Sequence, residues 1–262
     1  MAEDGDIVSN MHRFFADLVQ SADERIILSG ENARHAALVL RLSPGDEIMV
    51  GSGDGRDYSC KIESITAEEV VAEILDISGN AAELPVEITL FQGFPKGDKL
   101  DLIIQKSVEL GVHRIVPVWM SRSIVKMDEA KAKKRRDRYQ SISEAAAKQS
   151  GRGIIPEIGA FLSMKEAVKD AAKLDRILLP YENAKGMEYT RKVLGEIRDE
   201  NEKGTVRSLG IFIGPEGGFE EGEVTALQEI GAEVITLGHR ILRTETAGMT
   251  MMSILSYILE KD

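Results

Sequence analysis

The sequence predicts a two-domain α/β protein, in which a small β-rich module precedes a larger domain built on a mostly parallel sheet. Short alternating strands with glycine-rich turns fill the first 80 residues, and strand-like apolar runs alternate with helical patterns from Pro85 onward. The length of 262 residues also exceeds a typical domain of about 150. We therefore expect a flexible leader at 1–11, a barrel at 12–80 and a second domain at 85–262.

Period-2 patterns carry the prediction for the first domain. Tyr58, Cys60 and Ile62 alternate with polar residues, as a half-buried strand requires. We expect strands at 25–28, 47–50, 57–65 and 70–75 and an amphipathic helix at 31–42. The glycine-rich run 51–55 resembles part of a dinucleotide fingerprint, but no helix pattern follows it, so it predicts a hairpin turn.

The second domain alternates strands with helices, which is typical of βαβ units. We expect strands at 87–92, 114–118, 176–179, 209–213 and 233–237. Helices are expected at 99–110, 130–149, 164–172, 221–230 and 244–259, two of which end before Gly111 and Gly231. Because ligands of parallel sheets bind at the carboxyl ends of the strands, the chemistry is expected in this domain.

Composition limits the class of protein. The chain is 43% apolar and 29% charged, with one cysteine and four histidines. A single cysteine excludes an internal disulfide, and the histidines lie too far apart for a short metal-binding motif. No apolar run reaches the roughly 18 residues of a membrane span. We expect a cytoplasmic protein that is not exported and holds no metal.

A local basic segment interrupts an acidic chain. The net charge is −11, yet residues 96–152 carry 14 Lys and Arg against 7 Asp and Glu. Basic patches of this kind contact RNA phosphates, although a run on one helix is also an ordinary solvated face. The residues expected to bind RNA are Arg13, Lys96, Arg122, Lys134, Arg135, Arg138 and Arg152. Arg13 precedes Phe14 and Phe15, a combination that can stack on an extruded base.

Three loops that follow predicted strands are expected to form a pocket. The turn 214–219 holds three glycines, which allow close approach of the backbone to a ligand. It lacks the lysine and hydroxyl of a phosphate loop, and acids start the next helix. The loops 180–183 and 238–243 lie at the ends of two other strands. Together they predict a nucleotide-like pocket; the alternative is three connections without a ligand.

The order and spacing of several short motifs are specific. They are His12-Arg13-Phe14-Phe15, Gln92-Gly93-Phe94-Pro95-Lys96, residues 106–112, residues 144–150, Ile213-Gly214-Pro215-Glu216-Gly217-Gly218, and Leu237-Gly238 through Ala247. In this order the chain resembles the ribosomal RNA small subunit methyltransferase E family of the SPOUT superfamily. The resemblance extends over nearly the whole chain after residue 11.

The resemblance implies a PUA-like β-barrel for RNA binding, followed by a SPOUT methyltransferase domain with a deep trefoil knot, and a homodimer. It also implies methyl transfer from S-adenosylmethionine to N3 of a uridine in 16S rRNA, on the 30S subunit. The cofactor-binding residues carried over by the resemblance are Leu179, Pro180, Gly214, Gly218, Leu237, Gly238, Ile241, Leu242, Arg243 and Ala247.

The reaction places simple demands on the protein, because the methyl group is already activated and mainly has to be positioned. We expect Arg13 or Arg243 to stabilise negative charge on the uracil oxygens. The base is open between Glu216, Glu245 and water. Two other functions remain: methylation of another RNA target, and a non-catalytic RNA-binding or assembly factor. A dinucleotide-dependent enzyme is disfavoured by the missing fingerprint.

Overall fold

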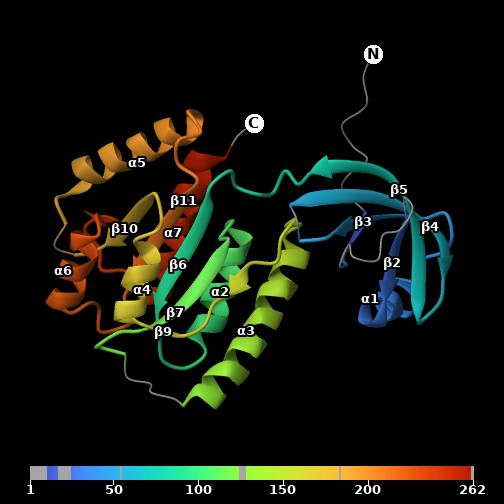
Figure 1. Cartoon of the computed structure of the whole chain (residues 1–262), viewed down its shortest axis with the longest axis horizontal. Helices are drawn as coiled ribbons and strands as arrows, with labels where there is room; N and C mark the ends of the chain where they lie inside the picture. The colour runs from blue at the N-terminus through green and yellow to red at the C-terminus, as the bar shows by residue number, and fades with distance from the viewer. Residues whose placement is uncertain (1–10, 17–24, 54, 124–127, 183, 261–262) are drawn as a thin grey trace. The chain divides into compact units, whose positions relative to one another are not determined.

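The computed structural model describes residues 11–16, 25–53, 55–123, 128–182 and 184–260 (Figure 1). The leader expected at 1–11 therefore lies almost wholly outside the described residues. The chain forms two units, one of Met1–Glu83 with Ala147–Ile155 and one of Leu84–Ala146 with Pro156–Asp262. The sequence prediction placed Ala147–Ile155 in the second domain, whereas these residues pack with the first unit.

The first unit is a curled five-stranded mixed sheet, with strand order β1-β3-β4-β5-β2. Its strands are β1 (His12–Phe15), β2 (Arg25–Ser29), β3 (Glu47–Gly51), β4 (Arg56–Ile65) and β5 (Glu69–Gly79). β1 runs parallel to β3, and the other pairs are antiparallel. The antiparallel pairing of β3 with β4 confirms the hairpin at 51–55. This architecture agrees with the expected PUA-like domain.

The predicted helix at 31–42 is only partly α-helical. It consists of α1 (Gly30–Arg34) and the π-helical turn η3 (His35–Val39). Ala33 and Ala36 are buried, whereas Leu38 and Val39 are 63% and 68% exposed. A π-turn holds one more residue than an α-turn, so the apolar stripe rotates away from the core. An amphipathic helix at 31–42 is therefore only partly confirmed, since Leu38 and Val39 face away from the core.

Cys60 lies in the core of the first unit and is fully buried on β4. Burial raises the pKa of its thiol to about 12. We expect the native protein to resist a thiol reagent at pH 8, because three pKa units lower the thiolate fraction about 1,000-fold. Ellman's reagent in the presence and absence of urea measures this. Rapid modification without denaturant would contradict the burial.

A buried ion pair joins the segment Ala147–Ile155 to the rest of the first unit. Arg152 is 2% exposed, and its Nη2 lies 2.7 Å from Glu83 Oε2. The Glu83 carboxylate also accepts the backbone N–H groups of Gly153 at 2.7 Å and Ile154 at 3.1 Å. Asn80 donates to the Gly151 carbonyl at 3.1 Å. Residues far apart in the sequence thus complete the first unit.

The second unit is a parallel sheet, with strand order β12-β10-β11-β6-β7-β8 and β9 paired to β7 (Figure 1). All described pairs in it are parallel. The strands are β6 (Glu87–Gly93), β7 (Arg114–Trp119), β8 (Glu157–Ile158), β9 (Leu162–Ser163), β10 (Arg176–Pro180), β11 (Ser208–Ile213) and β12 (Glu233–Ile235). The parallel α/β sheet typical of SPOUT enzymes is confirmed.

The described helices of this unit match the sequence prediction except for α5, which was not predicted. They are α2 (Lys99–Glu109), α3 (Glu129–Gln149), α4 (Met164–Ala171), α5 (Met187–Glu202), α6 (Glu221–Glu229) and α7 (Thr244–Leu259). α7 packs against α2 and α5. Reciprocal capping boxes start α4 at Ser163 and α6 at Glu220. No helix among the described residues is long and apolar enough to cross a membrane.

The buried central strands of the sheet fix the positions of the loops at its carboxyl edge. Phe91 on β6 and Phe212 on β11 stack with ring centroids 4.5 Å apart, and both are fully buried. β6 and β11 are paired in register, with Gln92 beside Ile213. In a parallel sheet every carboxyl end meets the same edge. The loops after β6, β10, β11 and β12 are therefore neighbours there.

Candidate cofactor pocket

A pocket of about 720 Å³ opens at this edge of the sheet. Its walls are the loop after β10, the glycine turn after β11 and the loop 236–243 after β12, and the start of α7 closes it. Pockets of roughly 300–1,000 Å³ suit small organic ligands. The structure thus brings together the three loops that the sequence analysis singled out.

The glycine turn is tight, and two of its positions disfavour a side chain. Gly218 has a φ of +71° and donates its N–H to the Pro215 carbonyl at 2.9 Å. A Cβ on Gly214 would lie 3.1 Å from the Phe219 ring. Gly93 is crowded from the neighbouring strand, since a Cβ there would lie 2.6 Å from the Pro215 nitrogen. Glycine at these positions lets the turn fold against the end of β6.

The loop 236–243 is fixed at its start. Thr236 Oγ1 accepts from the Gly238 N–H and donates to the Gly238 carbonyl, both at 3.2 Å. Thr190 on α5 is buried, and its hydroxyl accepts the Thr236 N–H at 3.0 Å. α5 therefore holds the beginning of the loop, and the rest extends along the pocket.

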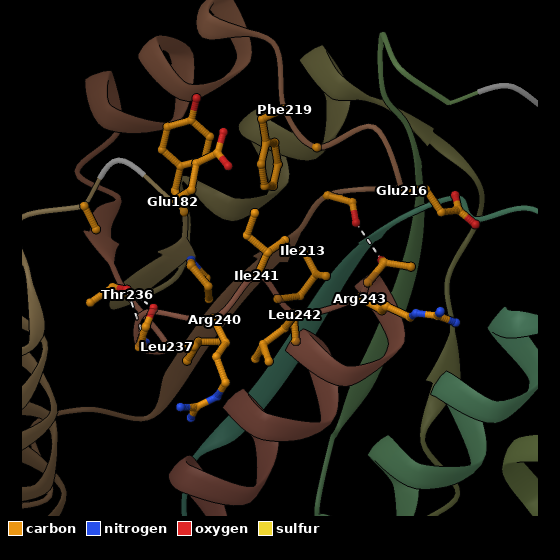
Figure 2. Close-up of a pocket in the computed structure, with 18 of the residues that line it drawn as sticks. Glu182, Ile213, Glu216, Phe219, Thr236, Leu237, Arg240, Ile241, Leu242 and Arg243 are labelled. Carbon is orange, nitrogen blue, oxygen red and sulfur yellow. Dashed lines mark hydrogen bonds between the residues drawn. The ribbon is translucent and has the colours of Figure 1, made fainter.

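Apolar side chains occupy the middle of the pocket. In Figure 2, Ile213, Phe219, Ile241 and Leu242 surround the central space, while Glu216 and Arg243 lie on one side of it. Ile241 is 89% exposed. A large apolar side chain that is so exposed inside a pocket provides a surface for a flat apolar ligand.

A charged cluster lies at the side of the pocket that holds Glu216. The Glu216 carboxylate accepts the Lys96 backbone N–H at 3.1 Å and pairs with Lys99 Nζ at 2.8 Å. Lys99 Nζ also lies 3.9 Å from Glu245 Oε2. Partial burial alone would raise the pKa of Glu216, but the hydrogen bonds from Lys99 and the backbone hold it below its ordinary value. Glu216 is thus a poor proton acceptor.

Arg122 holds the far end of the glycine turn. Its Nη1 donates to the Gly217 carbonyl at 2.8 Å, and its Nε pairs with Glu220 at 2.7 Å. The Ser121 N–H beside it donates to Glu223 at 2.8 Å. Two bonds therefore tie the loop after β7 to the start of α6, and a third ties it to the glycine turn. Arg122 itself lines the pocket.

Most residues that the resemblance assigned to the cofactor line this pocket. They are Pro180, Gly214, Gly218, Leu237, Gly238, Ile241, Leu242, Arg243 and Ala247. Leu179 differs, because its side chain is fully buried in the core below. Sequence reasoning did not place Lys99, Arg122 or Met187 in the pocket, although it named Arg122 as an RNA-binding residue; all three reach the pocket from other parts of the chain. Only the fold brings them close, and no local pattern marks them.

The predicted RNA-binding residues have different environments. Lys96 and Lys134 are exposed, and Arg138 is exposed but pairs with Asp101. The guanidinium of Arg135 lies 5.6 Å from the Phe94 ring centroid. Arg152 differs from the others, because its side chain is buried and pairs with Glu83; its predicted RNA contact stays a prediction.

Arg13 belongs to the first unit and has defined partners there. Its guanidinium pairs with Asp57, and its Nε donates to the Arg152 carbonyl at 3.1 Å. The side chain is only 14% exposed. These bonds give Arg13 a structural role in the first unit, whereas its predicted roles in catalysis and RNA binding stay predictions.

No cluster of His, Cys, Asp or Glu among the described residues could hold a metal ion. The pocket is lined by backbone groups, apolar side chains and a few charged groups. Such a lining suits an organic ligand that is bound and oriented.

Comparisons with known proteins point to one family. Residues 82–256 match the model of the RNA methyltransferase domain, and residues 28–75 match that of the RNA methyltransferase PUA domain. The ribosomal RNA small subunit methyltransferase E of Bacillus subtilis (strain 168) is 36% identical over 95% of this chain and 98% of its own length.

Solved structures agree with this result. The crystal structure of a ribosomal RNA small subunit methyltransferase E from Neisseria gonorrhoeae, bound to S-adenosyl methionine, is 31% identical with a TM-score of 0.79. A putative methyltransferase from Legionella pneumophila, in complex with the same cofactor, is 28% identical with a TM-score of 0.77. Each comparison covers 95% of this chain and 98% of the other. The chain belongs to the ribosomal RNA small subunit methyltransferase E family of RNA methyltransferases.

Proposed function

We propose that this protein methylates N3 of a specific uridine in 16S rRNA, with S-adenosylmethionine as the methyl donor and the 30S subunit as the substrate. The observation that carries the proposal is the pocket at the carboxyl edge of the sheet, in a chain whose relatives are named as rRNA methyltransferases. Its exposed Ile241 and half-buried Leu242 suit an adenine ring.

Different residues of the pocket would have different roles in the reaction. The glycine turn and the loop 236–243 would hold the cofactor, which supplies an activated methyl group. In the transfer the N3–methyl bond forms, the methyl–sulfur bond breaks and the imide proton leaves. Arg243 would stabilise the negative charge on the uracil oxygens. Since Glu216 is already bonded to Lys99 and to a backbone N–H, Glu245 or water is the better proton acceptor.

Charge favours a preassembled ribosomal particle over free RNA. The chain carries a net charge of −11, so long-range attraction to RNA is weak. α3 nevertheless presents exposed Lys131, Lys133 and Lys134. We propose that the second unit contributes to RNA binding through local contacts of this helix and Lys96 with phosphates.

We further propose a homodimer formed through the second unit. α2 packs against α7, and both helices expose apolar side chains, with Leu102 at 44% and Tyr257 at 86% exposed. Sedimentation equilibrium at micromolar concentration measures the mass. A monomer under these conditions would contradict the dimer without affecting the proposed reaction.

Two roles for Arg122 can be separated by mutation. If Arg122 mainly holds the glycine turn, Arg122→Ala should weaken S-adenosylmethionine binding only about threefold, since exposed ion pairs contribute little. The KM for 30S subunits should then stay unchanged. Calorimetry and initial rates measure the two constants. A raised KM for subunits with normal cofactor binding would instead support the predicted RNA contact.

The decisive experiment uses 30S subunits from cells that lack the native enzyme. The purified protein is incubated with labelled S-adenosylmethionine and these subunits, and the rRNA is digested to nucleosides. We expect label in 3-methyluridine. Label in another nucleoside would retain a methyltransferase with a different target, whereas no transfer and no cofactor binding would favour an RNA-binding or assembly factor.

A further inference from the structure

A chain of two hydrogen bonds crosses the floor of the pocket. Gln92 Nε2 donates to Thr244 Oγ1 at 2.8 Å, and Thr244 Oγ1 donates to the Gly214 carbonyl at 2.6 Å. Gln92 is fully buried and Thr244 is 6% exposed. The chain therefore lies in a dry environment, where hydrogen bonds are strong and costly to break.

These bonds join three segments that are distant in the sequence. Gln92 is near the end of β6, Gly214 opens the glycine turn, and Thr244 begins α7 directly after Arg243. Gln92 is also paired in register with Ile213, the residue before Gly214. The hydroxyl of Thr244 thus fixes the loop that carries Arg243 against the glycine turn, which is the opposite wall of the pocket.

The donors and acceptors of the chain are mutually consistent. With the Thr244 hydroxyl proton directed to Gly214, this oxygen accepts from Gln92. Gln92 Nε2 gives its second proton to the Gly93 carbonyl at 3.0 Å. A flipped amide would turn its oxygen toward the Gly93 carbonyl oxygen, so the hydrogen-bond partners favour the assigned orientation.

This orientation has a cost, because Gln92 Oε1 is buried and has no hydrogen-bond partner among the described residues. An apolar side chain of similar length would avoid that cost. Local costs of this kind are characteristic of functional sites, where position matters more than stability. Gln92 is thus better explained by what it positions than by what it contributes to the core.

We propose that Gln92 and Thr244 are positioning residues for cofactor binding, which hold the glycine turn and the Arg243 loop at a fixed separation. This inference rests on the proposed function and adds to it two residues that touch neither the methyl group nor the base. Without the Thr244 hydroxyl, the Gly214 carbonyl loses its partner and the two walls are no longer joined.

The test compares Thr244→Val, which keeps the side-chain shape, with Thr244→Ser, which keeps the hydroxyl. Calorimetry of the full chain with S-adenosylmethionine should give a Kd about tenfold higher for the valine variant, equivalent to about 1.4 kcal/mol. The serine variant should stay within about twofold of wild type. At saturating cofactor the valine variant should recover most of its kcat. Thr205→Val serves as control, because the Thr205 hydroxyl bonds only the Glu200 carbonyl in an exposed turn among the described contacts.

A second variant keeps the test independent of the folding of the first. Gln92→Met removes the amide and leaves the Thr244–Gly214 bond, and we expect a Kd about threefold higher. Unchanged affinity in a folded Thr244→Val protein, or equal losses in the valine and serine variants, would overturn the inference; if the valine variant does not fold, unchanged affinity in Gln92→Met would do so. Wild-type protein that binds no S-adenosylmethionine would instead overturn the proposed function.

Discussion

Replacing Arg243 with alanine is expected to lower kcat for methyl transfer about 100- to 1,000-fold, the loss typical of removing one donor that stabilises developing negative charge. Arg243 is exposed at the pocket and lies on the same side as Glu216 (Figure 2). Single-turnover rates with saturating S-adenosylmethionine and 30S subunits measure the effect. The cofactor Kd, measured separately, should change less than about tenfold.

The matched control for this prediction is Arg191→Ala. Arg191 is an exposed arginine on α5 that does not line the pocket, so the variant makes the same change in net charge. We expect wild-type rates from it. Intact methylation by Arg243→Ala, with cofactor binding retained, would remove Arg243 from the mechanism. A loss that high cofactor concentrations restore would make Arg243 a binding residue only.

Replacing Glu83 with alanine is expected to lower the free energy of unfolding of the first unit by about 3–5 kcal/mol, because it removes the carboxylate that pairs with a buried arginine. Arg152 is 2% exposed, and two backbone N–H groups lose the same acceptor. Hydrogen exchange of the amides in β4 and β5 reports on this unit directly. Those amides should exchange faster in the variant, while amides of β6 and β11 should not.

An exposed ion pair of the same unit provides the control. Arg25 and Glu63 approach to 2.9 Å with side chains 55% and 35% exposed. Glu63→Ala should therefore cost less than about 1 kcal/mol. Equal effects of the two substitutions would show that the Glu83 pair is solvated and that the buried environment described for Arg152 is incorrect.

Much of the second unit was predictable because its strands are buried on both faces. β6, β7, β10 and β11 read as mostly apolar runs, and Gly111 and Gly231 follow two of the helices. The three pocket loops were also predictable, since each follows a predicted strand. The family resemblance then supplied the identity of the ligand, which the strand pattern does not contain.

α5 was missed for an identifiable reason. The residues that it buries are Thr190, Val193, Ile197 and Asn201, so two of the four inward positions are polar. Thr190 bonds the Thr236 backbone, and Asn201 donates to the Leu259 carbonyl at 3.1 Å. Partners that lie far along the chain satisfy these groups. An apolar periodicity at 3.6 residues therefore does not show in the sequence.

Arg152 illustrates the same limit for the site. A basic residue at the end of a basic segment indicates a surface contact, and its partner Glu83 lies 69 residues away. Whether an arginine faces solvent or a buried carboxylate depends on tertiary structure alone. The pairing of Thr244 with Gln92, 152 residues apart, was unpredictable for the same reason.

The return of Ala147–Ile155 to the first unit affects how the protein can be divided. The chain passes between the two units three times, after Glu83, after Ala146 and after Ile155. A fragment that ends at Glu83 keeps all five strands of its sheet but loses Arg152, and a fragment that begins at Leu84 exposes an arginine that is normally buried. Truncation at the obvious boundary therefore damages both halves, and an exchange of PUA-like units between relatives must transfer two separate pieces of sequence together.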